Sequence, residues 1–159
     1  MVSRAWVEVD RGALRRNLRR VVTAAGPGAS VLPMVKADAY GLGMAEAVRA
    51  CRDELSEAEL YGFGVAAVAE GEALRAAGWT GRIVVCAPAP PGEFPRAARA
   101  GLTPALSTVD AVRLWADAAR RAGRRLAFHA EIDTGMGRAG LPFAAAAACG
   151  PAVAEAAAD

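Results

Sequence analysis

Residues 31–43 read Val-Leu-Pro-Met-Val-Lys-Ala-Asp-Ala-Tyr-Gly-Leu-Gly. Apolar residues lead directly to Lys36, which predicts a buried strand over 31–36, and Gly41 and Gly43 then allow a tight turn. A helix over 44–55 follows, so the stretch has the form of a strand–turn–helix unit. In parallel α/β proteins ligands bind beyond the carboxyl ends of the strands. Lys36 is therefore predicted to lie where such proteins place functional residues.

Lys36 is also the only lysine of the chain, because the other eighteen of its nineteen basic residues are arginines. A lysine amine can lose its proton and attack a carbonyl carbon, whereas an arginine guanidinium stays protonated. The alternative is a solvated surface charge that an arginine bias happened to spare. We favour the reactive amine.

The rest of the chain repeats the alternation of strand and helix. The predicted strands are 6–9, 31–36, 61–66, 83–86, 103–106 and 126–132. The predicted helices are one from its N-cap Asp10 to about residue 26, then 44–55, 68–77, 95–100, 109–121 with Ser107 as its cap, and one after Pro142. Such alternation implies parallel strands with right-handed crossovers.

Two architectures fit this order, a doubly wound sheet and a (β/α) barrel. A complete barrel needs about 250 residues, and only five barrel-type strands follow from Val31 in a chain of 159 residues. We therefore expect an incomplete (β/α)8 TIM-type barrel of about five parallel strand–helix units, which occupies residues 1–159 as a single partial domain.

Composition excludes several classes of protein. The net charge of +2 is too small to indicate nucleic-acid binding, and the basic runs are expected to be solvated helix faces. Neither a membrane span nor a secretory signal is expected. The three cysteines are too widely spaced for a metal motif and are expected to be reduced, so no metal is predicted and the expected location is cytoplasmic.

A second candidate segment covers residues 125–138. The predicted strand alternates between an apolar face that packs under helices and a face with ionisable groups toward its carboxyl end. The apolar face comprises Leu126, Phe128, Ala130 and Ile132, and the other comprises Arg125, Ala127, His129, Glu131 and Asp133. His129, the only histidine, is expected to be a hydrogen-bonded core residue and not a catalytic one.

Arg138 follows this strand after a turn with two glycines. Its guanidinium suits bidentate capture of a carboxylate or a phosphate. An ion pair with Glu131 or Asp133 that merely steadies the turn is the alternative. If both strands belong to one sheet, Lys36 and Arg138 reach the same rim.

Residues beside Lys36 extend the prediction. Tyr40 offers a phenol, and the backbone amides of residues 41–44, at the start of the next helix, offer donors for an anion. An amine, an anion-binding nest and a carboxylate clamp together describe a site for pyridoxal phosphate and an amino acid.

At this point the residues resemble a known family. The segments Val-Lys-Ala-Asp-Ala-Tyr-Gly-Leu-Gly at 35–43 and Asp-Thr-Gly-Met-Gly-Arg at 133–138, in this order, resemble alanine racemase, and so does the opening Arg-Ala-Trp-Val-Glu-Val-Asp at 4–10 with Ala13, Leu14 and Asn17. The resemblance runs through the chain but covers only the first part of such an enzyme.

The resemblance implies a (β/α)8 barrel that carries pyridoxal 5'-phosphate, followed by a mostly β domain, in a homodimer whose subunits complete each other's sites. By match, Lys36 would hold the cofactor as an imine and act as the base on one face of the substrate. Tyr40 would contact the cofactor phosphate, and Arg138 would bind the substrate carboxylate. The implied activity is interconversion of L- and D-alanine, which supplies D-alanine for the cell wall.

This sequence departs from the family at two motif positions. Leu42 stands where the family usually has His, with little loss expected because that His is neither acid nor base. Glu131 stands where many members have a carboxylated Lys that orients the arginine, so we expect Glu131 to support Arg138 by accepting its hydrogen bonds.

The missing second barrel half and β domain affect the expected activity. We expect this chain alone neither to racemise alanine nor to hold the cofactor tightly. The alternatives are a serine racemase or another pyridoxal-phosphate barrel enzyme, and a non-catalytic truncated remnant. The residues present do not decide between alanine and serine.

Overall fold

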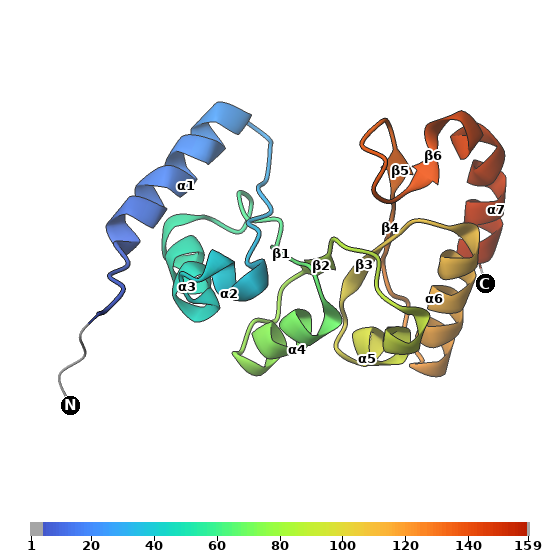
Figure 1. Ribbon diagram of the computed structural model, residues 1–159, viewed down its shortest axis with the longest axis horizontal. Helices are drawn as coiled ribbons and strands as arrows, with labels where there is room; N and C mark the ends of the chain where they lie inside the picture. The colour runs from blue at the N-terminus through green and yellow to red at the C-terminus, as the bar shows by residue number, and fades with distance from the viewer. Residues whose placement is uncertain (1–4, 159) are drawn as a thin grey trace. The chain divides into compact units, whose positions relative to one another are not determined.

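A computed structural model describes residues 5–158 of the chain. Two compact units make up the chain, Met1–Gly62 and Phe63–Asp159. Both are built from short extended segments connected by helices, as the alternation in the sequence predicts (Figure 1).

The first unit holds the helices α1 (Arg11–Ala25), α2 (Lys36–Tyr40) and α3 (Met44–Glu54). Asp10 caps α1 as predicted, because its Oδ1 accepts a hydrogen bond from the backbone N–H of Ala13 at 3.0 Å. Helix α1 packs against α3 and has no buried residue. Charge therefore contributes to this packing, and Arg19 donates to the carboxylates of Glu54 at 3.1 Å and Glu59 at 2.6 Å.

The strand predicted over 31–36 is present only in part. The N–H of Val31 donates to the carbonyl of Glu59 at 2.7 Å, and the N–H of Tyr61 donates to the carbonyl of Val31 at 2.9 Å, which is a parallel bridge. A continuous ladder does not form, because Pro33 has no N–H to donate. The segment nevertheless delivers the buried Val35 and then Lys36.

The second unit contains a parallel sheet in the order β1 (Phe63–Val65), β2 (Ile83–Val85), β3 (Thr103–Leu106) and β4 (His129–Ala130). The pairs Phe63↔Ile83, Val84↔Thr103 and Ala105↔His129 set the register. All residues of β1 and β2 are buried, as expected for central parallel strands. The predicted parallel α/β architecture is confirmed, and the sheet is open and not a closed barrel.

Helices α4 (Val68–Ala76), α5 (Phe94–Arg99) and α6 (Val109–Arg121) connect these strands, and the short helix η1 (Pro91–Glu93) precedes α5. Figure 1 shows α4 and α5 below the strands, with α6 beside α5. The rings of Phe94 and Trp115 meet edge to face at 5.8 Å, which joins α5 to α6. The most buried large side chains of the unit are Trp115, Phe63, Phe94, Leu74, Ile83 and Leu102.

Arg75 lies at the end of the sheet where β2 and β3 begin. It donates to the carbonyls of Trp79, Gly81, Ala100 and Gly101 at 2.6–3.0 Å. These carbonyls lie in the turns that enter β2 and β3. One guanidinium therefore donates to four backbone acceptors of these turns and ties the two turns together.

The predicted strand 126–132 is wrong as a single strand. The N–H of Glu131 donates to Leu106 at 2.9 Å, while its carbonyl accepts from Leu141 at 2.8 Å, so the chain changes partners at Glu131. Beyond it, β5 (Ile132–Asp133) pairs with β6 (Leu141–Pro142), before η2 (Phe143–Ala145) and α7 (Ala146–Ala158). The side chain of Ile132 is 46% exposed and does not pack under helices as expected.

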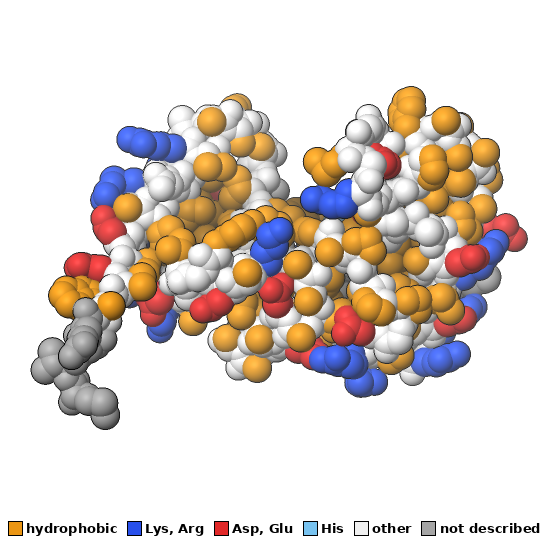
Figure 2. Space-filling view, in the orientation of Figure 1, with side chains coloured by type: hydrophobic (Ala, Val, Ile, Leu, Met, Phe, Trp, Pro, Cys, Tyr) orange, Lys and Arg blue, Asp and Glu red, His pale blue; other side chains and the backbone are white. Residues whose placement is uncertain are grey.

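Apolar side chains are exposed on this last part of the chain. Met136 and Phe143 join Ile132 in this set, and Figure 2 shows hydrophobic side chains gathered over β5, β6 and α7. The Ala-rich helix α7 has one buried residue, Ala156, among those described.

Two further sequence predictions are corrected. Residues 6–9 form no strand in the described part of the chain, because no neighbouring strand pairs with them, and Trp6 and Val7 are exposed. The cap of α6 is Thr108 and not Ser107, since Thr108 Oγ1 accepts from the N–H of Ala111 at 3.1 Å. The side chain of Ser107 binds Glu131 instead.

The three cysteines are free, as predicted. Cys51 is buried in α3, and this burial raises the pKa of its thiol to about 11. Within residues 5–158, no helix is both long enough and apolar enough to cross a bilayer.

Gly71 in α4 tests the packing of the second unit. A Cβ added there would lie 2.7 Å from Cδ1 of the buried Leu102, so we expect Gly71→Ala to lower the free energy of unfolding by about 1–3 kcal/mol through overpacking. Gly92 in η1 is the control, because its Cβ position is open and its φ suits an L residue. Gly92→Ala should raise stability by about 0.4–1 kcal/mol. Urea unfolding of both variants measures the difference, and equal effects would contradict the packing described.

Candidate active site

Lys36 begins a turn with an unusual backbone. Ala37, Asp38, Ala39 and Tyr40 all have φ between 51° and 58°, the left-handed conformation that non-glycine residues rarely adopt. A left-handed residue costs roughly 1–2 kcal/mol relative to the right-handed form. Four in succession therefore require strong local contacts to hold them.

Those contacts are hydrogen bonds within the turn. The N–H of Gly41 donates to the carbonyl of Ala37 at 3.0 Å, and the N–H of Gly43 donates to the carbonyl of Asp38 at 2.9 Å. The carboxylate of Asp38 then accepts from the N–H of Met44 at 2.6 Å, at the start of α3. The side chain of Ala39 is buried and anchors the middle of the turn.

The turn places Tyr40 beside Lys36. The Nζ atom of Lys36 lies 5.8 Å from the centroid of the Tyr40 ring, which is within range of a cation–π contact. Lys36 is half-buried, and Tyr40 is 64% exposed. A dissolved ligand can therefore reach both the amine and the phenol.

The predicted anion nest at residues 41–44 is wrong. Each of these four amides already donates within the turn: Gly41 to Ala37, Leu42 to Ala39, Gly43 to the carbonyl of Asp38 and Met44 to its carboxylate. None is left for a ligand phosphate. The start of α3 is capped by a side chain from six residues upstream, which the sequence pattern did not indicate.

The loop before Arg138 is also shaped by an aspartate. One carboxylate oxygen of Asp133 accepts from the N–H of Gly135 at 2.9 Å, and both oxygens accept from the N–H of Gly137, at 3.0 and 3.1 Å. These backbone donors hold the pKa of Asp133 below its ordinary value. The loop closes tightly, because a Cβ on Gly140 would lie 2.6 Å from the backbone nitrogen of Asp133.

Arg138 leaves this loop as an exposed side chain, and within residues 5–158 it has no ion pair or hydrogen bond. Glu131 is half-buried, and its Oε2 accepts a hydrogen bond from Ser107 Oγ at 2.9 Å. In the described structure neither Glu131 nor Asp133 pairs with Arg138. The guanidinium is thus available for a ligand carboxylate.

His129 is not the core residue that the sequence analysis predicted. It lies in β4 at the edge of the described sheet and is exposed. An edge strand has one neighbour, here β3, so its side chains are covered less completely than those of β1 and β2.

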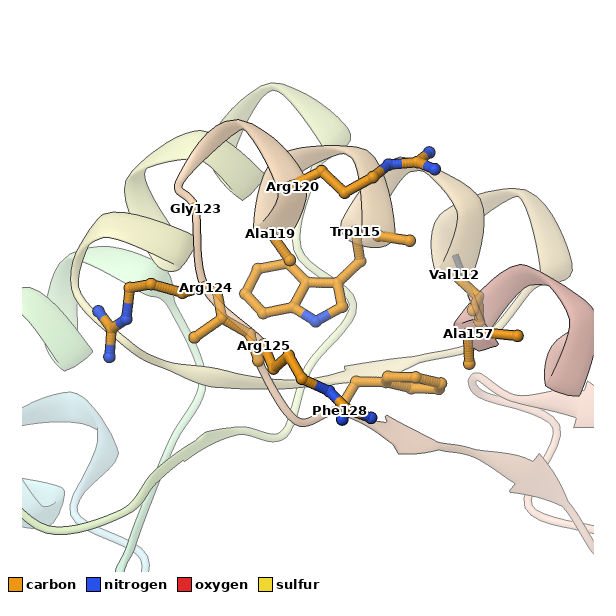
Figure 3. A pocket seen from close by; sticks show the side chains of 12 residues that line it. Val112, Trp115, Ala119, Arg120, Gly123, Arg124, Arg125, Phe128 and Ala157 are labelled. Carbon is orange, nitrogen blue, oxygen red and sulfur yellow. The ribbon is translucent and has the colours of Figure 1, made fainter.

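A cavity of about 580 Å³ lies elsewhere, under α6 (Figure 3). Trp115, Arg125 and Phe128 line it, and the buried Nε1 of Trp115 has no hydrogen-bond partner among the described residues. Figure 3 shows the Arg120 and Arg124 side chains directed away from the indole. The cavity borders the segment that enters β4, at the amino end of the sheet, whereas parallel α/β proteins place active sites at the carboxyl end.

The candidate residues therefore form two local groups. Lys36 and Tyr40 share the turn in Met1–Gly62, and Glu131 and Arg138 flank the glycine loop in Phe63–Asp159. Sequence reasoning missed the two aspartates that shape these loops. The spacing of Asp133 and Gly135 is typical of an Asx turn and could have indicated the second.

The chain is similar to known proteins of one family. Residues 9–158 match the family model described as alanine racemase, N-terminal domain. The alanine racemase of Geobacter sulfurreducens is 40% identical over 141 residues, which are 89% of this chain and 36% of the relative. The chain thus spans little more than a third of the length of the curated relatives that it matches.

Solved structures agree. An alanine racemase of Clostridium difficile superposes with a TM-score of 0.82 at 26% identity, over 89% of this chain and 36% of that one. The alanine racemase of a D-cycloserine-producing Streptomyces lavendulae gives a TM-score of 0.82 at 33% identity, over 94% of this chain and 38% of that one. The chain therefore belongs to the alanine racemase family and matches the amino-terminal domain of that family.

Proposed function

We propose that this chain is the amino-terminal part of a pyridoxal-phosphate-dependent alanine racemase, an isomerase, and that it contributes the covalent lysine and the carboxylate-binding arginine. The observation that carries the proposal is the turn at residues 36–44, which presents the only lysine beside Tyr40 in a chain of this family. The second barrel half and the β domain that the resemblance implies would belong to the part of the relatives' length that this chain does not match.

The residues present fit the cofactor in part. The accessible Lys36 amine suits a covalent bond to the cofactor aldehyde, and the exposed Tyr40 phenol suits a hydrogen bond to its phosphate. The amides of residues 41–44 are occupied, so further phosphate donors must come from outside this turn. When bound, the cofactor withdraws electrons from the substrate Cα and so makes its proton removable.

The other two roles, proton transfer and binding of the substrate carboxylate, fall to Lys36 and Arg138. The Lys36 amine would act on one face of alanine: it removes the Cα proton from one enantiomer, and it delivers a proton to Cα when the base on the opposite face has removed one from the other enantiomer. Arg138 fixes the substrate carboxylate through a bidentate contact and so orients Cα. A Tyr of the second domain of the partner subunit is the expected base on the opposite face.

The proposal includes a homodimer in the cytoplasm and a supply of D-alanine for the cell wall. Serine is the alternative substrate, since the residues described here do not include the whole pocket wall. A non-catalytic remnant is the alternative outside the enzymes.

Trapping at Lys36 tests the proposal on the chain itself. We expect borohydride reduction with pyridoxal phosphate to leave a pyridoxyl group on Lys36, and peptide mass spectrometry distinguishes this position from the α-amino group. The bound cofactor should be lost on dialysis without reduction, because the turn alone supplies few phosphate contacts. Urea-unfolded chain is the control, and equal labelling of folded and unfolded chain would contradict a formed site.

A chimera tests the activity. Residues 1–158 joined to the unmatched remainder of the Geobacter sulfurreducens relative should racemise alanine, and Lys36→Arg should lower kcat by about 100- to 10,000-fold through loss of the base. Arg138→Lys should raise KM by about 10- to 100-fold, because one bidentate charged contact is lost. A chimera that is folded, binds the cofactor and racemises serine faster than alanine would favour the alternative substrate.

Glu131 is tested in the same chimera. If its carboxylate supports Arg138 during binding, Glu131→Gln should raise KM with little change in kcat. Ser107→Ala is the matched control, because it removes the hydrogen bond that Glu131 accepts in the structure and leaves the carboxylate in place. Kinetics of Glu131→Gln equal to those of the parent would refute the supporting role.

A further inference from the structure

We infer that Asp38 is the positioning residue of the lysine turn, and that its carboxylate holds Tyr40 against Lys36 by capping α3. The inference deepens the proposed function, on which its catalytic relevance rests. Asp38 is not expected to touch the substrate or the cofactor. It acts through the shape of the backbone on either side of it.

The contacts of Asp38 tie both ends of the turn together. Its carbonyl accepts from Gly43 at 2.9 Å, and its Oδ1 accepts from Met44 at 2.6 Å. Gly43, the residue at the N-cap position of α3, has no side chain with which to cap the helix. A carboxylate at this helix end also interacts favourably with the helix dipole. Asp38 therefore substitutes for the missing cap and, in doing so, fixes its own left-handed conformation.

This conformation decides where Tyr40 lies. The residues 37–40 are all left-handed, and of these only Asp38 is of a type that adopts this region with some ease. Ala37, Ala39 and Tyr40 have no such preference and follow only because the turn is closed at Gly43 and Met44. Without the carboxylate contact the turn is free to relax toward right-handed backbone, which carries the Tyr40 ring away from Lys36.

A simple stabilising cap is the competing explanation. Asp10 provides the matched control, because it caps α1 in the same way through a hydrogen bond from Ala13 at 3.0 Å. It belongs to another helix, and its side-chain hydrogen bonds in the described structure join it to Ala13 and Arg16 of that helix. Asp10→Ala should lower stability without changing the geometry at Lys36, whereas Asp38→Ala should change that geometry.

The single lysine makes the geometry measurable. In protein labelled with ¹³C-lysine, only Lys36 contributes side-chain signals, and its ε-CH₂ protons should be shifted upfield by the Tyr40 ring. Tyr40→Leu removes the ring and sets the unshifted value. We expect Asp38→Ala to give this unshifted value, Asp10→Ala to keep the parental shift, and Asp38→Asn, which retains an acceptor oxygen, to restore most of it.

Each outcome decides the inference. An Asp38→Ala variant that keeps the parental Lys36 shift overturns it, and so does an Asp38→Asn variant that loses the shift while remaining folded. If Asp38→Ala does not fold, slow hydrogen exchange of the Met44 amide in the parent together with the Asp38→Asn shift supports the inference, and fast exchange refutes it. Failure of Lys36 to form a pyridoxyl adduct in the parent would count against the proposed function alone, because the ring-current shift needs no cofactor.

Discussion

Parallel pairing of β1, β2 and β3 is the constraint on which the second unit depends. Strands buried on both faces must be connected by helices that return along the sheet, so each strand ends at the same edge. Arg75 bridges the turns at the entrance edge. The exit edge is left to loops, and the loop that leads to Arg138 is one of them. The amino ends of these strands are therefore fixed by hydrogen bonds from Arg75, and the loop that leads to Arg138 lies at their carboxyl ends.

An aspartate carboxylate shapes the candidate loop in each unit. The Asp38 carboxylate accepts a hydrogen bond from the first N–H of α3, and the Asp133 carboxylate accepts hydrogen bonds from the N–H groups of Gly135 and Gly137. In both cases the carboxylate is used by the backbone and the neighbouring cation remains accessible. A carboxylate close to a lysine or an arginine in sequence is easily assigned to an ion pair. Here the backbone amides provide its partners instead.

The fold class was predictable from the sequence, because buried parallel strands such as 83–85 are short apolar runs between helical patterns. The point at which a strand changes its hydrogen-bonding neighbour was not predictable. At Glu131 this change depends on Leu106 and Leu141, which are distant in the sequence or follow a loop. Lys36 and Arg138 could be picked out as candidate site residues from the two sequence motifs that contain them. The left-handed turn could not, since local preference of Ala37 and Ala39 opposes it and the compensation comes from hydrogen bonds that no spacing rule describes.

The hydrogen bonds that tie Ala37, Asp38 and Ala39 to the amides of residues 41–44 begin and end within one short segment, residues 35–44. Much of what presents the amine is thus encoded by one decapeptide, with the burial of Ala39 as its anchor to the rest of the unit. Such a segment can be conserved while the sequence around it changes. It can also be grafted as a unit onto another scaffold that has an extended segment before it and a helix after it. A substitution inside it disturbs hydrogen bonds whose partners lie in the same segment, so its tolerated changes are expected to come in coupled pairs.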